Sequence, residues 1–197
     1  MNNRSLFEVA DNQQGFFTAK QAIKCGYSSK NHAYFVKTKK WIKEGRGIYR
    51  LADYPLGERP DLMKYYLWSR DKNDVPQAVF SHATALMLYN LSDIMPEKIF
   101  MTVPKKFKRR SKIPSILKIY KKDLLKNEVK FYLGVKITTP IRTIIDVIEE
   151  NVIAHELISQ AIDEALSRGL IISKKKILTY PYLINKKNLI KIVESFL

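Results

Sequence analysis

The sequence predicts an α+β protein in which a winged helix-turn-helix is followed by a small mixed sheet covered by helices. Two observations predict this fold. Residues 16–51 read as two short helices, joined by a glycine-containing turn and followed by a hairpin, which is the element order of a winged helix-turn-helix. Residues 99–138 then carry short β-branched and aromatic runs with helical patterns on either side, which indicates a sheet covered by helices.

The N-terminal module begins with a predicted helix over residues 5–12, which a polar break at 13–15 ends. The next helix starts after Thr18, because threonine is a good N-cap, and stops at Gly26. Glycine is a common helix terminator because it adopts the left-handed backbone conformation without strain. These two helices therefore precede a third, which we expect to be the recognition helix.

The third helix is expected to begin after Ser28 or Ser29 and to run to about Lys39. At about 100° per residue, two sides of this helix differ in character. The side expected to pack on the preceding helix carries Ala33, Phe35 and Val36, with His32 at its border. The outward side carries Lys30, Asn31, Tyr34, Lys37 and Thr38.

This outward side has the chemistry of a nucleic-acid contact. Asparagine pairs with adenine edges, and lysine pairs with guanine edges or phosphates. A phosphate-binding rim is expected beside it, at the end of the helix and along the hairpin, with Arg46 at the hairpin tip. The rim consists of Lys39, Lys40, Lys43, Arg46 and Arg50. Many charged helix faces are simply solvated, but Glu44 is the only acid between Lys30 and Arg50, so we expect contact with DNA or RNA.

Bulk composition agrees with a polyanionic partner. The 197 residues carry a formal net charge of +16 and a sequence pI of about 9.8, which favours nucleic acid first and an anionic membrane surface second. Cys25 is the single cysteine, so an internal disulfide and the cysteine-rich zinc patterns are excluded. The chain has neither an apolar run of roughly 18 residues nor an apolar signal core. We therefore expect a cytoplasmic protein without a membrane partner.

The chain is expected to divide into three parts. Residues 1–52 form the winged helix-turn-helix, 53–60 form a linker with two prolines and a glycine, and 61–197 form an α+β domain. Within the last part, strands are expected at 99–103, 116–120, 129–133 and 135–138. Helices are expected after Asp61, after Ser81, from Pro140, over 154–167, after Ser173 and around 187–196.

A second basic block lies in the C-terminal part. Its lysines and arginines are interrupted by no acid in the sequence, and two aromatic residues lie among them. The block consists of Lys105, Lys106, Lys108, Arg109, Arg110, Lys112, Lys118, Lys121 and Lys122. Two interpretations stay open: a secondary nucleic-acid surface centred on residues 105–110, or a solvated loop and strand edge that lysines protect from aggregation.

No catalytic site is predicted. His82 follows Ser81, but the serine is explained as a helix cap, so His82 is expected to be structural. Arg142 and Asp146 lie four residues apart, which predicts an ion pair along a helix surface. No phosphate loop, dinucleotide fingerprint or metal-ligand pattern is present. The chain is therefore expected to be no enzyme and to need no cofactor or metal.

The order of several motifs resembles the AbiEi family of antitoxins, which are transcriptional regulators from bacterial abortive-infection and type IV toxin–antitoxin operons. The motifs are Gly15–Ala22, Gly47–Leu51, Phe80–Leu86, Ile99–Pro104 with Arg109 and Arg110, Thr138–Asp146 and Ala165–Leu170. The resemblance implies that the winged helix binds operator repeats in double-stranded DNA and represses its own operon. It further implies that the C-terminal domain counters a nucleotidyltransferase-like toxin without a stable complex.

Two alternatives come from other functional classes. One is an RNA-binding module that takes a tRNA-like target on the basic block of residues 105–122. The other is a nucleic-acid-processing enzyme whose site a single sequence does not reveal.

Overall fold

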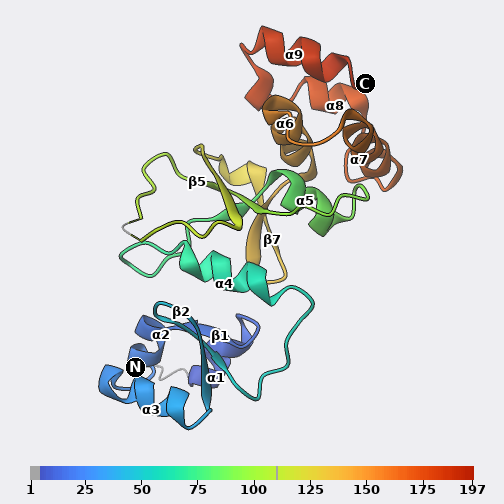
Figure 1. The fold of residues 1–197 in the computed structure, drawn as a ribbon. Helices are drawn as coiled ribbons and strands as arrows, with labels where there is room; N and C mark the ends of the chain where they lie inside the picture. The colour runs from blue at the N-terminus through green and yellow to red at the C-terminus, as the bar shows by residue number, and fades with distance from the viewer. Residues whose placement is uncertain (1–4, 110) are drawn as a thin grey trace. The chain divides into compact units, whose positions relative to one another are not determined.

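The computed structural model describes residues 5–109 and 111–197. The chain divides into two compact units, and Figure 1 labels their helices and several of their strands. The first takes in the chain up to Ala78 together with Tyr132–Val135, and the second comprises Val79–Phe131 and Lys136–Leu197. Among the described residues, no helix is both long enough and apolar enough to span a membrane.

The first unit contains a winged helix-turn-helix, as the sequence predicts. Its elements in chain order are α1 (Leu6–Asp11), β1 (Phe16–Thr18), α2 (Ala19–Lys24), the 3₁₀ turn η1 (Ser29–Asn31), α3 (His32–Lys37), β2 (Trp41–Gly45), β3 (Ile48–Leu51) and α4 (Pro60–Trp68). Helices α2 and α3 form the helix-turn-helix, and the β2–β3 hairpin is the wing.

Two capping boxes start the first two helices. The Ser5 hydroxyl accepts a hydrogen bond from the Glu8 backbone N–H at 3.2 Å, and the Glu8 carboxylate accepts one from the Ser5 N–H at 3.1 Å. Thr18 and Gln21 make the same reciprocal pair at 3.1 and 2.8 Å. Each box satisfies two N–H groups that a helix start otherwise leaves without partners, which explains why such short helices begin at these residues.

Strand β1 is an addition to the prediction, which left Phe16 and Phe17 without an assignment. The strand pairs antiparallel with β3, which pairs antiparallel with β2, so the sheet order is β1-β3-β2. Phe17 lies opposite Tyr49, and the rings of Phe17 and Trp41 meet edge to face at 4.8 Å. A strand of three residues, all buried, is too short to display the alternation that identifies strands in sequence.

Helix α4 begins at Pro60, the first helical position, where proline is tolerated. The predicted cap, Asp61, is instead inside the helix and pairs with Arg59 at 2.7 Å. Helix α4 contacts all three strands of the N-terminal sheet. The compact unit therefore extends past residues 53–60, although the division into domains at that segment stays a prediction.

The second unit is built on a mixed sheet. Its strands are β4 (Val79–Phe80), β5 (Ile99–Val103), β6 (Leu117–Lys121), β7 (Val129–Tyr132) and β8 (Val135–Thr138), with a 3₁₀ turn, η2 (Lys126–Glu128), before β7. The order is β6-β5-β4-β8-β7. Strand β4 runs antiparallel to β5 and parallel to β8, and β5 runs parallel to β6. This confirms the predicted small mixed sheet.

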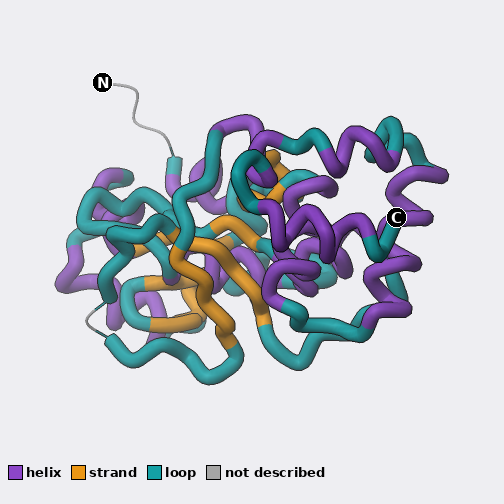
Figure 2. Tube along the Cα trace, turned by 90° about the horizontal axis from the view of Figure 1, so that it is seen from above, coloured by secondary structure: helices purple, strands orange, loops and turns teal. Residues whose placement is uncertain are grey.

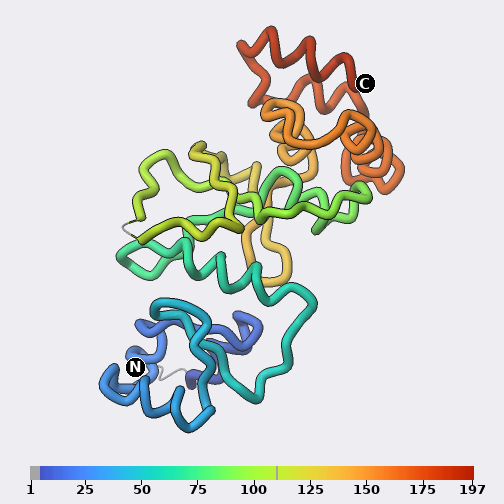
Figure 3. Tube along the Cα trace, in the orientation of Figure 1, coloured from blue at the N-terminus to red at the C-terminus, as the bar shows by residue number. Residues whose placement is uncertain are grey.

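Helices of the second unit pack on this sheet and on one another. They are α5 (His82–Tyr89), α6 (Pro140–Glu150), α7 (His155–Ser167), α8 (Lys174–Leu178), the 3₁₀ turn η3 (Pro181–Leu183) and α9 (Lys187–Glu194). Helix α5 contacts β5 and α6, and α6 contacts α7 and α9. The helices α6 to α9 gather at the C-terminal end of this unit, as the tube views show (Figures 2 and 3). Their shared apolar core includes Ile144, Ile158 and Val193.

Candidate nucleic-acid interface

The recognition helix is shorter than predicted. Gly26, at the end of α2, has a φ of +90°, a left-handed conformation that glycine adopts readily. In place of one helix from Ser28 or Ser29 to Lys39, the chain forms the 3₁₀ turn η1 and then α3. Lys39 has a φ of +56°, so the helix does not continue through it.

His32 is the buried anchor of α3. Its Nε2 lies 3.3 Å from the carbonyl oxygen of Tyr27, and its ring centroid lies 5.2 Å from that of Trp41. Phe35 stacks on Trp41 with ring centroids 4.7 Å apart and planes 21° apart. Ala33, which was expected on the packed side, is exposed. The physical reason is that η1 has about 3.0 residues per turn, which changes the angular phase from that of a continuous α-helix.

The predicted outward side spans η1, α3 and the residue after α3. All five of its predicted residues are exposed: Lys30, Asn31, Tyr34, Lys37 and Thr38. Tyr34 is 60% exposed, which leaves its phenol available at the surface. The Thr38 hydroxyl donates a hydrogen bond to the Tyr34 carbonyl at 2.9 Å and so contributes to ending the helix. Within the described residues, no carboxylate lies within 4.0 Å of the Lys30 or Lys37 ammonium group.

The predicted rim lies beside this face, at the start of β2 and in the wing. Lys39, Lys40 and Lys43 are exposed, and Arg46 is exposed in the turn between β2 and β3. The Arg70 guanidinium donates to the carbonyl oxygens of Arg46 and Gly47, both at 3.1 Å. This pair of hydrogen bonds braces the backbone of the wing while the Arg46 side chain stays in solvent.

Arg50 does not lie on the rim. Its side chain is buried, and its Nε donates to the Glu44 carboxylate at 3.2 Å. Its Nη1 also donates to the carbonyl oxygens of Leu51 and Tyr54 at 3.3 and 3.4 Å. A signal for this was present in the sequence, because Arg50 is two residues from the apolar Ile48 and therefore shares its face of the strand. This ion pair occupies Glu44, the only acidic residue between Lys30 and Arg50.

The second basic block is partly exposed. Lys105, Lys106 and Lys108 are exposed in the loop after β5, whereas Arg109 is half-buried. Arg110 lies outside the described residues. Phe107, an aromatic residue of this block, is buried. The structure thus brings three of the five predicted residues to the surface of one loop.

Lys122, at the end of the same block, has a different environment. Its ammonium group lies 2.8 Å from Glu149, 2.9 Å from Glu150 and 3.9 Å from Asp146, all on α6. The block contains no acid in the sequence, but folding packs an acidic helix, α6, against the end of β6. Lys122 is therefore a structural cation.

Arg142 and Asp146 form an ion pair in the interior instead of on the helix surface. Both side chains are fully buried, and Arg142 Nη2 lies 2.9 Å from Asp146 while its Nη1 lies 2.9 Å from Glu128. The guanidinium also lies over the Tyr182 ring at 3.6 Å. Burial lowers the pKa of Arg142, but the two carboxylates outweigh that effect and raise it above its ordinary value. Spacing alone does not distinguish this pair from a surface pair, since both obey the four-residue rule.

Glu149 extends this network to the C-terminal tail. Its carboxylate accepts hydrogen bonds at 2.7 to 2.8 Å from Lys122, Tyr182 and Lys186. Burial alone raises the pKa of Glu149, but these three donors outweigh it and lower the pKa to about 2. The network joins α6 to the tail by charge-assisted hydrogen bonds, which are stronger than those between neutral groups, and no motif in the sequence predicts it.

His82 is buried and held by hydrogen bonds at the start of α5. Its Nδ1 lies 2.8 Å from the Ser81 hydroxyl, which also lies 2.9 Å from the Thr102 hydroxyl. Its ring stacks on Tyr120 with centroids 3.9 Å apart. Ser81 occupies the N-cap position, but its side chain makes no capping hydrogen bond, because its hydroxyl is used by these two partners.

The side chain of His82 is fully enclosed. Burial, followed by the nearby charges of Lys122 and Arg142, lowers the pKa of His82 to about 3, so the imidazole is neutral at pH 7. Nowhere in residues 5–109 and 111–197 do three His, Cys, Asp or Glu side chains come close enough to hold a metal ion.

The comparison with protein families points to the same segment of the chain as the exposed basic residues. Residues 4–52 match the family model described as transcriptional regulator, AbiEi antitoxin. A search of curated proteins found no match. The matched segment covers α1 to β3, which are the elements of the winged helix-turn-helix. That family consists of regulators and antitoxins rather than enzymes. Over residues 4–52 this chain is therefore similar to the AbiEi family of antitoxin transcriptional regulators.

Proposed function

We propose that this protein is a transcriptional regulator that places α3 in the major groove of its own operator DNA. The observation that carries the proposal is the exposed and uncompensated charge of α3 and the wing. Glu44, the one acid in this stretch, pairs with the buried Arg50 at 3.2 Å and lies 3.9 Å from Lys64. The exposed lysines of the face are therefore left to attract a polyanion.

The roles of individual side chains follow from their chemistry. Asn31, the last residue of η1, presents an exposed amide and Tyr34, on α3, an exposed phenol, and these two are the candidates for contacts with base edges. Lys30, Lys37 and Thr38 flank them. Lys39, Lys40 and Arg46 are the candidates for phosphate contacts, which fix the register of a protein on DNA without reading sequence. Arg50 has no direct role in this proposal, because it is buried.

The test compares two classes of substitution in fluorescence anisotropy, with the operon's upstream DNA and a scrambled duplex. Asn31→Ala and Tyr34→Ala are expected to cut discrimination between the duplexes by about 1–3 kcal/mol. Lys40→Ala and Arg46→Ala are expected to weaken the binding of both duplexes by the same factor. Lys187→Ala, which removes an exposed lysine of α9, is the matched charge control. If all five variants behaved the same, the assignment of the recognition face would be wrong.

The antitoxin role is proposed for the second part of the chain, residues 61–197, on the strength of the family match at the N-terminus. In this proposal it counters a nucleotidyltransferase-like toxin in the cytoplasm without forming a stable complex. The test is co-expression with a nucleotidyltransferase encoded beside this gene. Growth arrest that the full chain relieves would support the role, and arrest that it fails to relieve would contradict it.

A second candidate function is RNA binding through the loop after β5, which the exposure of Lys105, Lys106 and Lys108 favours. RNA binding and operator binding both depend on phosphate contacts and share a salt dependence, so salt cannot distinguish them. A competition assay distinguishes them instead. If tRNA displaced labelled operator better than unlabelled operator did, the RNA proposal would replace the first. Incubation of labelled DNA and RNA with Mg²⁺ or Mn²⁺ tests the remaining alternative, a nucleic-acid-processing enzyme.

A further inference from the structure

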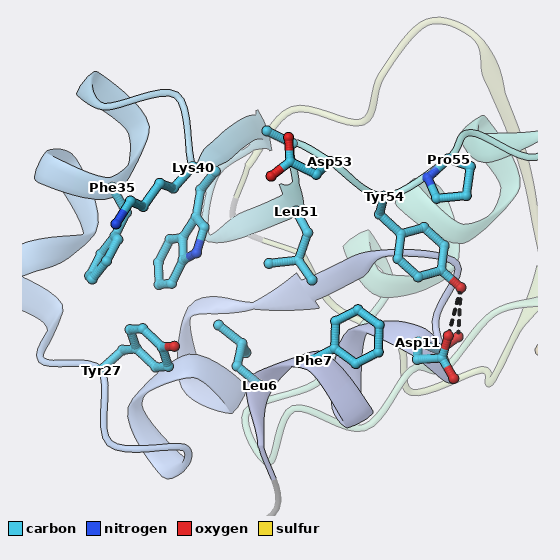
Figure 4. Close-up of a pocket in the computed structure, with 12 residues that line it drawn as sticks. Leu6, Phe7, Asp11, Tyr27, Phe35, Lys40, Leu51, Asp53, Tyr54 and Pro55 are labelled. Carbon is cyan, nitrogen blue, oxygen red and sulfur yellow. Dashed lines mark hydrogen bonds between the residues drawn. The ribbon is translucent and has the colours of Figure 1, made fainter.

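The first compact unit holds a pocket (Figure 4), and Lys40 is the one residue of its lining that also belongs to the surface proposed to contact DNA. Its volume is about 790 Å³, within the range of roughly 300–1,000 Å³ that small-molecule sites occupy. The lining comes from α1, the turn before η1, the end of α3, the start of β2 and the segment after β3. All of these elements belong to the first compact unit, so one folded unit forms the whole site.

The walls of the pocket are mostly apolar and aromatic. Figure 4 shows Leu6, Phe7 and Tyr27 on one side, and Phe35, Leu51 and Tyr54 on the other. Phe35 is stacked on Trp41, and Tyr27 meets Phe35 edge to face with ring centroids 5.3 Å apart. Phe7 is 60% exposed, which is unusual for a phenylalanine beside a core. Aromatic walls of this kind favour a flat, unsaturated ligand, because offset-stacked and edge-to-face contacts add to the burial of area.

Two charged side chains of opposite sign line the same pocket. Lys40 supplies an ammonium group and Asp53 a carboxylate. Neither side chain makes a hydrogen bond or an ion pair with the part of the chain that the structure describes. The third charged group, Asp11, already accepts a hydrogen bond from the Tyr54 hydroxyl at 2.9 Å. The pocket thus offers one cation and one anion to a ligand, which is the arrangement that complements a compound carrying both charges.

The pocket is connected directly to the recognition helix. Phe35 belongs to α3 and is the neighbour of Tyr34, which faces outward. The Lys40 N–H donates to the Phe35 carbonyl at 3.0 Å, and the Ala52 N–H donates to the Lys40 carbonyl at 3.1 Å. A ligand that changes the packing of Phe35 therefore acts on α3 and on the backbone that ends it.

We propose that this pocket is a binding site for a small aromatic compound that carries one ammonium and one carboxylate group. We further infer that its occupancy alters the affinity of α3 for DNA, a step that rests on the function proposed above. The aromatic body lies between the two apolar walls, the carboxylate meets Lys40, and the ammonium group meets Asp53.

The binding test uses three fluorinated probes and ¹⁹F NMR titration of the full chain. The probes are 4-fluoro-L-phenylalanine, which carries both charges, 4-fluorophenylacetate, which is only anionic, and 4-fluorophenethylamine, which is only cationic. The doubly charged probe is expected to bind roughly fivefold to tenfold more tightly than either of the others, since each charge-assisted contact contributes on that scale.

Substitutions in the pocket test which side chain contacts which charged group of the ligand. Lys40→Gln is expected to remove the advantage of the carboxylate, and Asp53→Asn the advantage of the ammonium group. Phe7→Ala removes part of an apolar wall without disturbing a core residue. This variant is expected to weaken the binding of all three probes by the same factor. Glu58→Gln, an exposed acid outside the pocket, is the matched control. Absence of saturable binding by every probe, or equal affinities in all four variants, would overturn the site.

The effect on DNA is measured separately, as the dissociation constant for a duplex with the pocket saturated by 4-fluoro-L-phenylalanine. A change of threefold or more that Asp53→Asn abolishes supports the coupling. An unchanged constant at saturation overturns the coupling and leaves the binding site standing. If the chain bound no DNA under any condition, the proposed function would fail, and the NMR titrations would still decide the pocket.

Discussion

His82 occupies an interior position in which protonation is unfavourable. Its backbone has a φ of +51°, an uncommon conformation for a residue other than glycine. Its ring is stacked on Tyr120 and faces the charges of Lys122, Arg142 and Glu149. Because burial, then Lys122 and Arg142, depress its pKa to about 3, His82 stays neutral in the folded state. In the unfolded chain the same residue titrates near its ordinary value of about 6.5.

We predict that stability falls with acidification because of His82. The lowered folded pKa means that its contribution is present above pH ~6.5 and is lost as the pH falls from there toward 3. Between pH 7 and 5 the free energy of unfolding is expected to drop by about 2 kcal/mol from this residue. His82→Asn keeps a residue that tolerates positive φ. Urea titrations of this variant are expected to give a free energy of unfolding that changes less between pH 7 and 5. His155→Asn, at an exposed histidine, is the control. If the free energy of unfolding of His82→Asn fell with pH as steeply as that of the parent protein, the assignment would be wrong.

Arg142 is predicted to be the charged side chain whose loss destabilises the second unit most. Its removal leaves Asp146 and Glu128 without their partner in the interior, and breaking a buried pair this way costs about 3–5 kcal/mol. We expect Arg142→Met to lower the urea midpoint by a corresponding amount. The double variant Arg142→Met with Asp146→Leu removes two of the three buried charges, leaving Glu128, and is expected to recover part of the loss. A single variant as stable as the parent would show that the ion pair contributes nothing.

At the scale of elements, short segments are positioned by their ends and by aromatic contacts. Helices α1 and α2 have six residues each, too few to be stable alone. Their capping boxes were readable in the sequence because Ser5 and Thr18 each precede a glutamate or glutamine by three residues. The true start of α3 was not readable, because the contacts of His32 and Phe35 with Trp41 come from residues that meet only in the fold.

Two glycines that both have positive φ are predicted to differ in their tolerance of alanine. A Cβ on Gly15 (φ +84°) would lie 2.6 Å from the Tyr54 ring, whereas a Cβ on Gly26 (φ +90°) would meet nothing within 4 Å. Gly26→Ala is therefore expected to cost only the backbone term of about 1–2 kcal/mol. Gly15→Ala is expected to cost more, because Tyr54 must move as well. Thermal unfolding of the two variants measures the difference, and equal melting temperatures would contradict the predicted clash.

At the scale of the whole molecule, the net charge of +16 predicts a strong salt dependence of DNA binding. If α3 and the wing contact about five to eight phosphates, a plot of log K against log salt has a slope of about −4 to −7. Arg46→Ala is expected to reduce that slope by about one, whereas Asn31→Ala is expected to leave it unchanged. A slope shallower than about −2 in the parent protein would contradict a phosphate-tracking interface.

The sequence by itself determined most of the helices and strands, the winged helix-turn-helix, the mixed sheet and the basic character of the segment from η1 to the wing. Capping residues, glycines and β-branched runs act over a few neighbouring positions, so they are visible along the chain. Only the tertiary structure decided which cations are structural. Lys122 and Arg142 read like exposed cations, yet folding brings the Glu149 carboxylate to Lys122 and the Glu128 carboxylate to Arg142. Whether a charge is solvated or buried depends on contacts between distant segments, and no local pattern contains that information.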